Sequence, residues 1–328
     1  MRRRDTFYDI LMMVVTNPLS EIIKRQGRII LDGGLATALE ARGHNLDDAL
    51  WSARLLIEEP EAIRRVHLDF LEAGADCITT SSYQASVQGF SARGLNEAEG
   101  RELLRLSTDF AVEARDIFWS RPINRRGRIR PLVAASIGPY GAFLADGSEY
   151  TGAYSIDDDA LYKFHRKRWQ VLAESPADLL ACETLPSLRE ARVLLRLLQE
   201  TPNRWAWLSF TCRDDSHLSD GTPFVDAVRA CTSAPGVAAV GVNCTAPRFI
   251  TSLMEQAIRA TDLPIIVYPN SGEVYDPAAK QWRTGGQEGA WVDDAVQWSE
   301  LGATGIGGCC RIEPAAITQL RQRLLPGR

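Results

Sequence analysis

The sequence predicts a single-domain α/β protein with a (β/α)8 (TIM) barrel, and three observations support this fold class. Eight short apolar or β-branched runs alternate with segments of helical periodicity from about residue 28 onward. The last segment is helical, as in a barrel whose final β/α unit is complete. Unusual polar residues gather where the runs end, and barrel enzymes place their chemistry at the C-terminal ends of strands. A doubly wound open sheet is the alternative, but no G-x-G-x-x-G motif follows the first run.

The expected elements follow one another regularly. Strands are predicted over residues 28–34, 76–82, 131–139, 178–184, 205–211, 237–244, 264–270 and 304–310. The clearest helices cover 60–74, 96–119, 157–175, 187–200 and 291–302. The connections after the third and seventh strands, 140–156 and 271–290, are long. Long loops in a compact barrel are usually lids or binding loops, so both are predicted to cover the site.

Composition narrows the class of protein. The chain has 328 residues and a formal net charge of −5, which disfavours a nucleic-acid-binding surface. No apolar run approaches the roughly 18 residues of a membrane span. Seven cysteines without a disulfide-like framework favour the reducing cytoplasm. The arginine-rich stretch 120–130 enters a strand at the opposite end of the barrel and is predicted to be solvated surface.

The domain boundaries are predicted from the same pattern. Residues 1–26 are interpreted as an N-terminal extension that frays, and 27–328 as the barrel domain. The first residues resemble a secretion signal, but acidic residues interrupt a brief apolar run and no small-residue cleavage site follows. Met13 is therefore an alternative to Met1 as the start of the protein.

Cysteines at two strand ends indicate a metal centre. Cys309 and Cys310 are adjacent and end the eighth run, while Cys244 ends the sixth. Neighbouring cysteines pair poorly with each other, because a disulfide needs a larger Cα separation than one trans peptide easily allows. The strand ends of a closed barrel surround one mouth, so the three sulfurs can converge. Three thiolates suit Zn²⁺ and leave the fourth tetrahedral position open. A redox-active vicinal pair is the main alternative.

The remaining cysteines and the histidines offer no second centre. Cys77, Cys182, Cys212 and Cys231 are expected to be ordinary buried side chains. The four histidines form no H-x-E or H-E-x-x-H pattern. Metal chemistry is therefore expected at the cysteines alone.

In chain order, the motifs resemble the homocysteine S-methyltransferases, especially the branch that uses S-methylmethionine or S-adenosylmethionine. The resemblance runs from about residue 28 to 320 and rests on "DGGLATALEARG", "LWSARLL", "HLDFLEAGADCITTSSYQAS", "SIGPYGAFLADGSEYTG", "ETLPS", "GVNCTAP", "YPNSGEVYD" and "GATGIGGCCR". The combination of Cys244 with Cys309 and Cys310 is its most specific feature. The first 20 or so residues and the arginine-rich stretch fall outside it.

The resemblance implies that Cys244, Cys309 and Cys310 hold one zinc ion per chain. It also implies that Asp32, the backbone of Gly33 and Glu183 bind the amino-acid end of homocysteine. A substrate ammonium needs acceptors and a counter-charge, so two carboxylates are chemically reasonable there. From the residues alone, a turn or helix cap at Asp32 and a structural ion pair at Glu183 are equally good interpretations.

Further site residues complete the predicted assignment. Asn243 is placed at the substrate site, directly before a zinc ligand. Residues predicted to contact the methyl donor or to form the lid are Tyr83, Tyr150, Asn270, Tyr275 and Trp282. Aromatic faces suit a sulfonium cation, and exclusion of water favours a reaction in which charge disappears.

The implied reaction transfers a methyl group from S-methylmethionine, or from S-adenosylmethionine, to the zinc-bound thiolate of L-homocysteine, and it forms methionine. A free thiol has a pKa of ~8.5, so zinc removes the need for a general base. Alternatives are a zinc hydrolase, a non-catalytic vicinal-thiol redox or zinc sensor and, within the family, a selenocysteine methyltransferase. The expected partners are small molecules only, without nucleic acid or membrane. The oligomeric state is not predicted.

Overall fold

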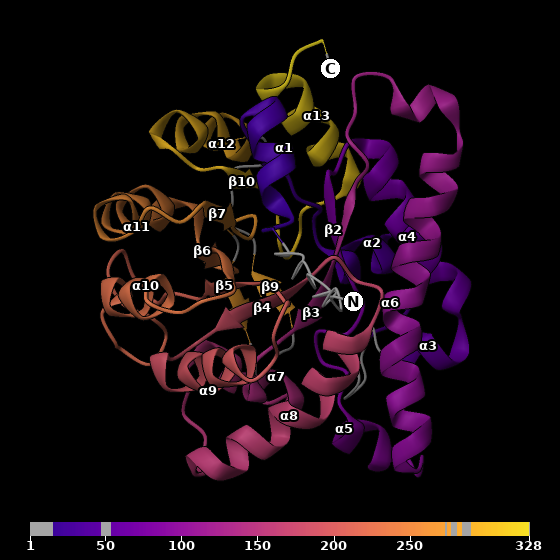
Figure 1. The fold of residues 1–328 in the computed structure, drawn as a ribbon, viewed down its shortest axis with the longest axis vertical. Helices are drawn as coiled ribbons and strands as arrows, with labels where there is room; N and C mark the ends of the chain where they lie inside the picture. Colours follow the sequence, from indigo (N-terminus) through magenta and orange to yellow (C-terminus); the bar gives the residue numbers. More distant parts are fainter. Residues whose placement is uncertain (1–15, 47–53, 273, 277–280, 284–289, 328) are drawn as a thin grey trace, which may run out of the picture.

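The computed structural model describes residues 16–46, 54–272, 274–276, 281–283 and 290–327. Its core is a parallel eight-stranded sheet that curls into a barrel, with helices around the outside (Figure 1). The predicted (β/α)8 architecture is therefore confirmed. The choice between Met1 and Met13 as the start falls outside the described residues.

The barrel strands lie where the sequence predicts them. They are β1 (Ile29–Ile30), β2 (Cys77–Thr79), β3 (Leu132–Ile137), β4 (Leu179–Leu185), β5 (Ala206–Phe210), β6 (Val237–Asn243), β7 (Ile265–Tyr268) and β10 (Gly305–Ile306). Their order in the sheet is β1-β10-β7-β6-β5-β4-β3-β2. A parallel bridge between Leu31 and Cys77 links the two edge strands, so the ring is nearly continuous. Only β4 extends past its predicted range, by one residue to Leu185.

The helices cover the outside of the barrel. They are α1 (Leu19–Gln26), α2 (Leu35–Ala41), α3 (Leu55–Glu58), α4 (Pro60–Ala73), α5 (Val87–Ser91), α6 (Glu97–Ser120), α7 (Tyr140–Leu144), α8 (Asp158–Glu174), α9 (Leu188–Gln199), α10 (Phe224–Thr232), α11 (Pro247–Ala260), α12 (Ala290–Leu301) and α13 (Pro314–Leu324). Local sequence sets several starts: Asn96 forms a capping box with Glu99 at α6, and the Asp157 side chain caps α8.

Short elements occupy the connections. The 3₁₀ helices η2 (Pro122–Arg125) and η3 (Ser148–Tyr150) lie before and after β3. The predicted loop after β7 contains an antiparallel ribbon of β8 (Val274–Asp276) and β9 (Gln281–Arg283). Both long connections therefore contain some regular structure.

Two apolar layers hold the barrel together. The larger lies between the sheet and the surrounding helices, and a smaller one fills the barrel interior around Trp207 and Ile266. Leu19 and Ile22 of α1 belong to the interior cluster, so this helix closes the N-terminal end of the barrel. The predicted boundary between residues 26 and 27 stays a prediction, but α1 within the predicted extension is packed on the barrel.

The four cysteines expected to be structural are all buried. Cys182, Cys212 and Cys231 face the outer layer and Cys77 the interior.

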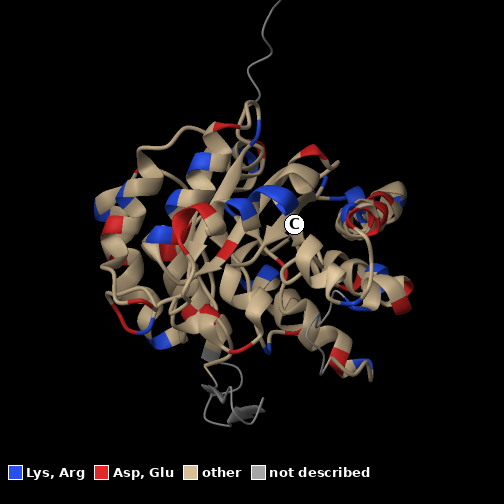
Figure 2. Ribbon diagram, turned by 90° about the horizontal axis from the view of Figure 1, so that it is seen from below, with Lys and Arg blue, Asp and Glu red and all other residues tan. Residues whose placement is uncertain are grey.

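Figure 2, which views the molecule from below the orientation of Figure 1, shows basic and acidic residues interspersed along the described helices, rather than one basic face. Among the described helices, none has both the length and the apolar character needed to cross a bilayer.

Candidate metal and substrate site

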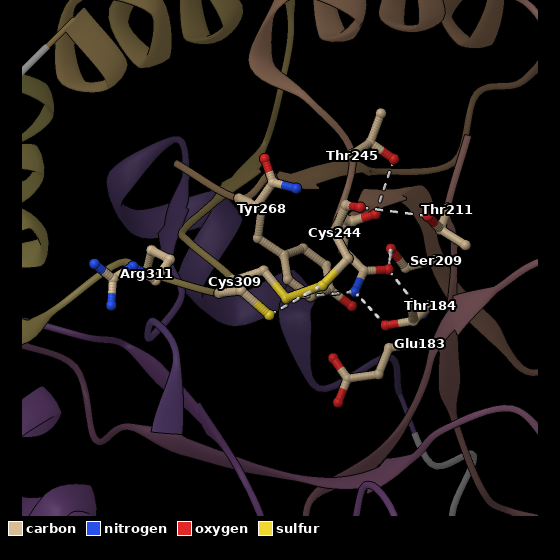
Figure 3. The surroundings of a disulfide bond; sticks show 12 residues. Glu183, Thr184, Ser209, Thr211, Cys244, Thr245, Tyr268, Cys309 and Arg311 are labelled. Carbon is tan, nitrogen blue, oxygen red and sulfur yellow. Dashed lines mark hydrogen bonds between the residues drawn. A yellow bond between two sulfur atoms is a disulfide. The ribbon is translucent and has the colours of Figure 1, made fainter. Parts of the chain in front are cut away.

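Three sulfur atoms meet at the C-terminal end of the barrel, which we call the mouth. Cys244 follows β6 in a left-handed conformation with φ 46°, and the Cys309 amide donates to the Pro269 carbonyl after β7 at 2.8 Å. Cys244 and Cys309 form a disulfide with a Cα–Cα distance of 5.6 Å (Figure 3). The Cys310 Sγ lies 3.7 Å from the Cys244 Sγ. The structure thus brings the three predicted metal ligands together.

The sulfur cluster fits the predicted ion in its donor chemistry. All three Sγ atoms lie within 4.8 Å of one another, and in the described part of the chain this is the one such group of potential ligands. An all-sulfur set with room for a fourth ligand suits Zn²⁺. The disulfide joins residues on different strands and not the two neighbours, in keeping with the poor geometry of a vicinal pair. Metal binding requires thiolates, so this bond must first be reduced.

Close contact between the loops after β1 and β10 shapes the site. The Gly308 amide donates to the Asp32 carbonyl, and the Gly34 amide to the Ile312 carbonyl, each at 2.9 Å. A Cβ on Gly33 would lie 2.4 Å from the Ile312 carbonyl oxygen, and one on Gly308 would lie 2.3 Å from the Ile312 side chain. These positions need glycine because the two backbones approach closely. The loop that holds Cys309 and Cys310 is thereby fixed against the loop that holds Asp32.

Asp32 and Glu183 are two buried carboxylates at the mouth. Asp32 accepts hydrogen bonds from the Thr79 amide (2.7 Å) and hydroxyl (3.1 Å), and Glu183 accepts one from the Ser136 hydroxyl. Burial raises the pKa of Asp32 to about 8 against the opposing effect of the Thr79 amide, and the charge of Glu183 adds to the rise. Burial likewise raises the pKa of Glu183 to about 7. No ion pair of the described residues includes either carboxylate, so this pair can accept a substrate ammonium.

Asn243 directly precedes Cys244 of the sulfur cluster, and its side-chain amide hydrogen-bonds to Thr184, the neighbour of Glu183. Its Oδ1 accepts from the Thr184 amide (2.8 Å) and the Ser209 hydroxyl (2.7 Å), and its Nδ2 donates to the Thr184 hydroxyl at 2.8 Å. Thr184 has φ 58°, a strained value for a β-branched residue. The amide therefore holds the irregular end of β4 in place, and Figure 3 shows Thr184 of this end beside Glu183. Its predicted contact with substrate stays a prediction.

The predicted donor and lid residues lie on loops around the mouth. Tyr83 and Tyr150 are partly buried, and Asn270 is buried with its Oδ1 accepting from the Gly272 amide at 2.9 Å. Tyr275 and Trp282 are opposite each other in the β8–β9 ribbon, and their side chains lie outside the described part of the structure. Their contact with a methyl donor stays a prediction.

Glu149 is a candidate site residue that the sequence reasoning missed. It lies in η3 beside Tyr150, and its Oε2 is buried with no hydrogen-bond partner among the described residues. Burial raises its pKa to about 7. Its charge contributes to the raised pKa values of Tyr83 and Cys310. The motif "GSEYTG" could have indicated it, but an acid in a loop usually indicates a solvated surface.

A buried network anchors the loop that contains Glu149. Glu190 of α9 accepts from the Tyr140 amide at 2.6 Å and from the Tyr154 hydroxyl, at the two ends of this loop. His165 contacts the same carboxylate at 2.7 Å. Burial lowers the pKa of His165 to about 4, so a neutral ring donates this bond. Glu190 therefore fixes both ends of the loop after β3 against α9.

Comparison with known proteins shows which family the chain resembles. Residues 29–324 match the family model described as homocysteine S-methyltransferase. The chain is 51% identical over 304 residues to homocysteine S-methyltransferase YbgG of Bacillus subtilis, covering 93% of this chain and 96% of the relative. It is 48% identical over 312 residues to homocysteine S-methyltransferase of Escherichia coli, covering 95% of this chain and 100% of the relative.

Solved structures add a comparison of the whole fold. The metallated form of the Escherichia coli homocysteine methyltransferase MmuM superposes with a TM-score of 0.84 at 46% identity, covering 94% of this chain and 100% of that one. Its oxidized form, with the same identity and coverage, gives a TM-score of 0.85. The similarity thus extends over nearly the entire barrel.

Proposed function

The chain belongs to the homocysteine S-methyltransferase family and is a methyltransferase, and from this premise we propose which substrates its site takes. The acceptor is L-homocysteine and the donor a sulfonium compound, S-methylmethionine in preference to S-adenosylmethionine. The main support is the meeting, at one mouth, of three sulfurs with two buried carboxylates that form no ion pair with a described residue. The sulfurs can hold a thiophilic metal, and the carboxylates can hold an α-ammonium group.

We infer that Cys244, Cys309 and Cys310 hold one Zn²⁺ per chain as thiolates. The sulfur-only donor set supports zinc over a hard cation such as Mg²⁺. When bound, the ion lowers the pKa of the substrate thiol so that its sulfur is a thiolate at neutral pH. Reduction of the Cys244–Cys309 disulfide consumes two electrons and two protons and must come first. The proposed site therefore functions in a reducing compartment, in agreement with the expected cytoplasmic location.

The amino-acid end of homocysteine is proposed to bind at Asp32, Glu183 and Gly33. An ammonium between the two carboxylates would favour their ionised forms and offset the cost of burying them. The Gly33 amide makes no hydrogen bond within the described part of the chain, so it can donate to the substrate carboxylate. Asn243 acts in this proposal as a positioning residue, because it fixes the backbone beside Glu183.

The methyl donor is proposed to enter over the loop after β3. Glu149 offers a negative charge with one unpartnered oxygen, and the Tyr83 and Tyr150 rings offer faces for a cation. In the transfer, the homocysteine sulfur forms the new S–CH₃ bond as the donor's S⁺–CH₃ bond breaks, and the electron pair returns to the donor sulfur. The thiol proton is released to solvent. Two neutral thioethers result, so exclusion of water by the covering loops favours the reaction.

A redox or zinc sensor is the second candidate function, because the structure contains the Cys244–Cys309 disulfide. A hydrolase has less support, since hydrolytic zinc sites generally include histidine or carboxylate ligands. Selenocysteine as the acceptor would use the same machinery. These possibilities differ in whether methionine is formed.

The test combines metal content with methyl transfer. The protein is purified under reducing conditions, loaded with zinc and supplied with homocysteine and each sulfonium donor. We expect one zinc per chain and methionine formation, both lost in Cys310→Ala. Cys231→Ala, which removes a buried sulfur in α10 away from the mouth, should retain both. A folded, zinc-loaded protein that forms no methionine with either donor would contradict the proposal, and the ratio of the two rates decides the preferred donor.

A further inference from the structure

A hollow of about 440 Å³ lies at the N-terminal end of the barrel, opposite the mouth. We call it the arginine hollow, and its walls include Gly74, Arg126, Arg128, Thr318 and Arg321. Figure 1 shows the segment between α6 and β3 beside α13 at this end. The sequence predicted the arginine-rich stretch to be solvated surface, but the Arg128 side chain is only 10% exposed. Three arginines from two distant parts of the chain thus gather in one concave place.

Positive charge exceeds negative charge in the arginine hollow. Arg321 and Arg128 share one carboxylate: Asp76 Oδ1 lies 2.9 Å from Arg321 Nη1 and 3.6 Å from Arg128 Nε. Asp76 lies behind the walls of the hollow, and Glu72, the acid in the walls, already contacts Arg65 at 3.4 Å and Arg121 at 3.3 Å.

Asp76 has little capacity left for the two guanidinium groups. Its other oxygen accepts from the Gln26 side chain at 2.6 Å and from the Ile30 amide at 3.1 Å. The Arg126 side chain makes no hydrogen bond or ion pair within the described ranges. An anion in the hollow would balance this excess of positive charge.

Two guanidinium groups are held by backbone carbonyls, and one of them still has an unused donor. Arg321 is 7% exposed, and its Nη1 donates to the Gly74 carbonyl at 2.8 Å. Arg128 Nη2 donates to the Ala75 carbonyl at 2.6 Å, and its Nε faces Asp76 at 3.6 Å. Arg321 Nη2 is buried without a hydrogen-bond partner in the described structure. Buried donors are rarely left unpaired, so this atom indicates a missing acceptor.

We propose that the arginine hollow binds the phosphate group of a small molecule. Guanidinium forks match tetrahedral oxyanions in charge and geometry, and the volume lies within the range of small-molecule sites, ~300–1,000 Å³. Thr318 and Gln322 of α13 add a hydroxyl and an amide to the walls. The concave shape and the net charge of −5 favour a small anion over a nucleic acid. This site is separate from the methyl-transfer site and does not depend on its proposed substrates.

Inorganic phosphate and pyrophosphate are the probes, used with the full-length protein. Titration calorimetry and thermal unfolding are measured against chloride at matched ionic strength. We expect a saturable rise in Tm with phosphate and a tighter effect with pyrophosphate. Arg126→Gln should weaken binding by about tenfold, as expected for loss of one hydrogen bond between charged groups. Arg166→Gln removes an exposed arginine from α8, on the other side of the barrel in Figure 1, and should leave the affinity unchanged.

Arg321→Lys provides a second test inside the hollow. The lysine retains the charge opposite Asp76 but removes the Nη2 donor, so phosphate affinity should fall while the protein stays folded. The rate of methyl transfer should be unchanged in Arg126→Gln. An equal response to phosphate and chloride, or the same affinity in Arg126→Gln as in the parent, would overturn the proposal. Binding of a duplex DNA oligonucleotide without any response to phosphate or pyrophosphate would also overturn it.

Discussion

The two ends of the barrel treat buried carboxylates in opposite ways. At the N-terminal end, Asp76 is fully buried and faces two arginines. At the mouth, Asp32 and Glu183 accept hydrogen bonds from neutral groups and face no cation in the described structure. Arginines of the chain itself therefore balance the charge of Asp76. At the mouth a substrate can supply the balancing cation, as expected for a site that binds an ammonium group.

The largest expected effect is on stability, in the variant Asp76→Asn. Removing the carboxylate leaves Arg321 and Arg128 buried without a counter-charge, and breaking a buried ion pair costs roughly 3–5 kcal/mol. The free energy of unfolding, measured by urea denaturation, should fall by about that amount. Asp116→Asn is the control, because Asp116 is exposed and its partners are the surface residue Arg130 and Arg115, which keeps Asp178 as a counter-charge. That change should cost less than ~1 kcal/mol. Equal losses in the two variants would show that burial of the pair is unimportant.

At the mouth, the variant Glu183→Gln should lose substrate affinity and keep its stability, which is the reverse of Asp76→Asn. Loss of a charged hydrogen bond to the substrate ammonium costs roughly 1.5–3 kcal/mol, which is about 10- to 150-fold in affinity for homocysteine. Stability should be unchanged or higher at pH 8, because a buried charge without a partner is removed. Calorimetric titration with homocysteine and thermal unfolding measure the two effects. A loss of stability as large as that of Asp76→Asn would mean that Glu183 is a structural group.

The pH dependence of stability sharpens the same contrast. The folded-state pKa values of Glu183 and Asp32, about 7 and about 8, lie above their unfolded values of 4.5 and 3.8. Between about pH 4 and pH 8 the native state therefore binds more protons than the unfolded state. These groups contribute stability that is fully present below about pH 4 and is lost as the pH rises to the folded-state pKa values of about 7 and about 8. The Tm of the parent should therefore fall, across that range, relative to the Tm of the double variant Asp32→Asn/Glu183→Gln. A difference independent of pH would contradict the raised pKa values.

The sequence predicted the positions of strands and of the main site residues because both depend on local patterns. Apolar runs located every barrel strand, and strand ends located Asp32, Glu183 and the three cysteines. Which side chains become partners depends on contacts between distant segments. Asn243 bonds to Thr184 across 59 residues, and Arg321 meets Asp76 across 245. The disulfide, the anchoring of Asn243 and the arginine hollow are therefore visible only in the folded chain.

Glu149 differs from the other mouth carboxylates in lying on the long connection after β3, and its removal should have the smallest effect of these changes. Glu149→Gln retains the shape and removes the charge opposite the proposed sulfonium donor. The KM for the donor should rise roughly 5- to 10-fold, which is the effect of losing about 1 kcal/mol of charge attraction. The KM for homocysteine should be unchanged, because Asp32 and Glu183 remain in place.

Asp146→Asn in the same loop is the matched control for this smallest effect. Asparagine can still accept the hydrogen bond that Asp146 receives from the Ser148 amide at 3.0 Å, so only an exposed charge is lost. Neither KM should rise in this variant, because loss of the Asp146 charge only favours the ionised form of Glu149. If Glu149→Gln instead raised the KM for homocysteine and left that for the donor unaltered, Glu149 would belong to the acceptor site. All three buried acids of the mouth would then bind one ammonium group, and the donor cation would have to be recognised by aromatic faces alone.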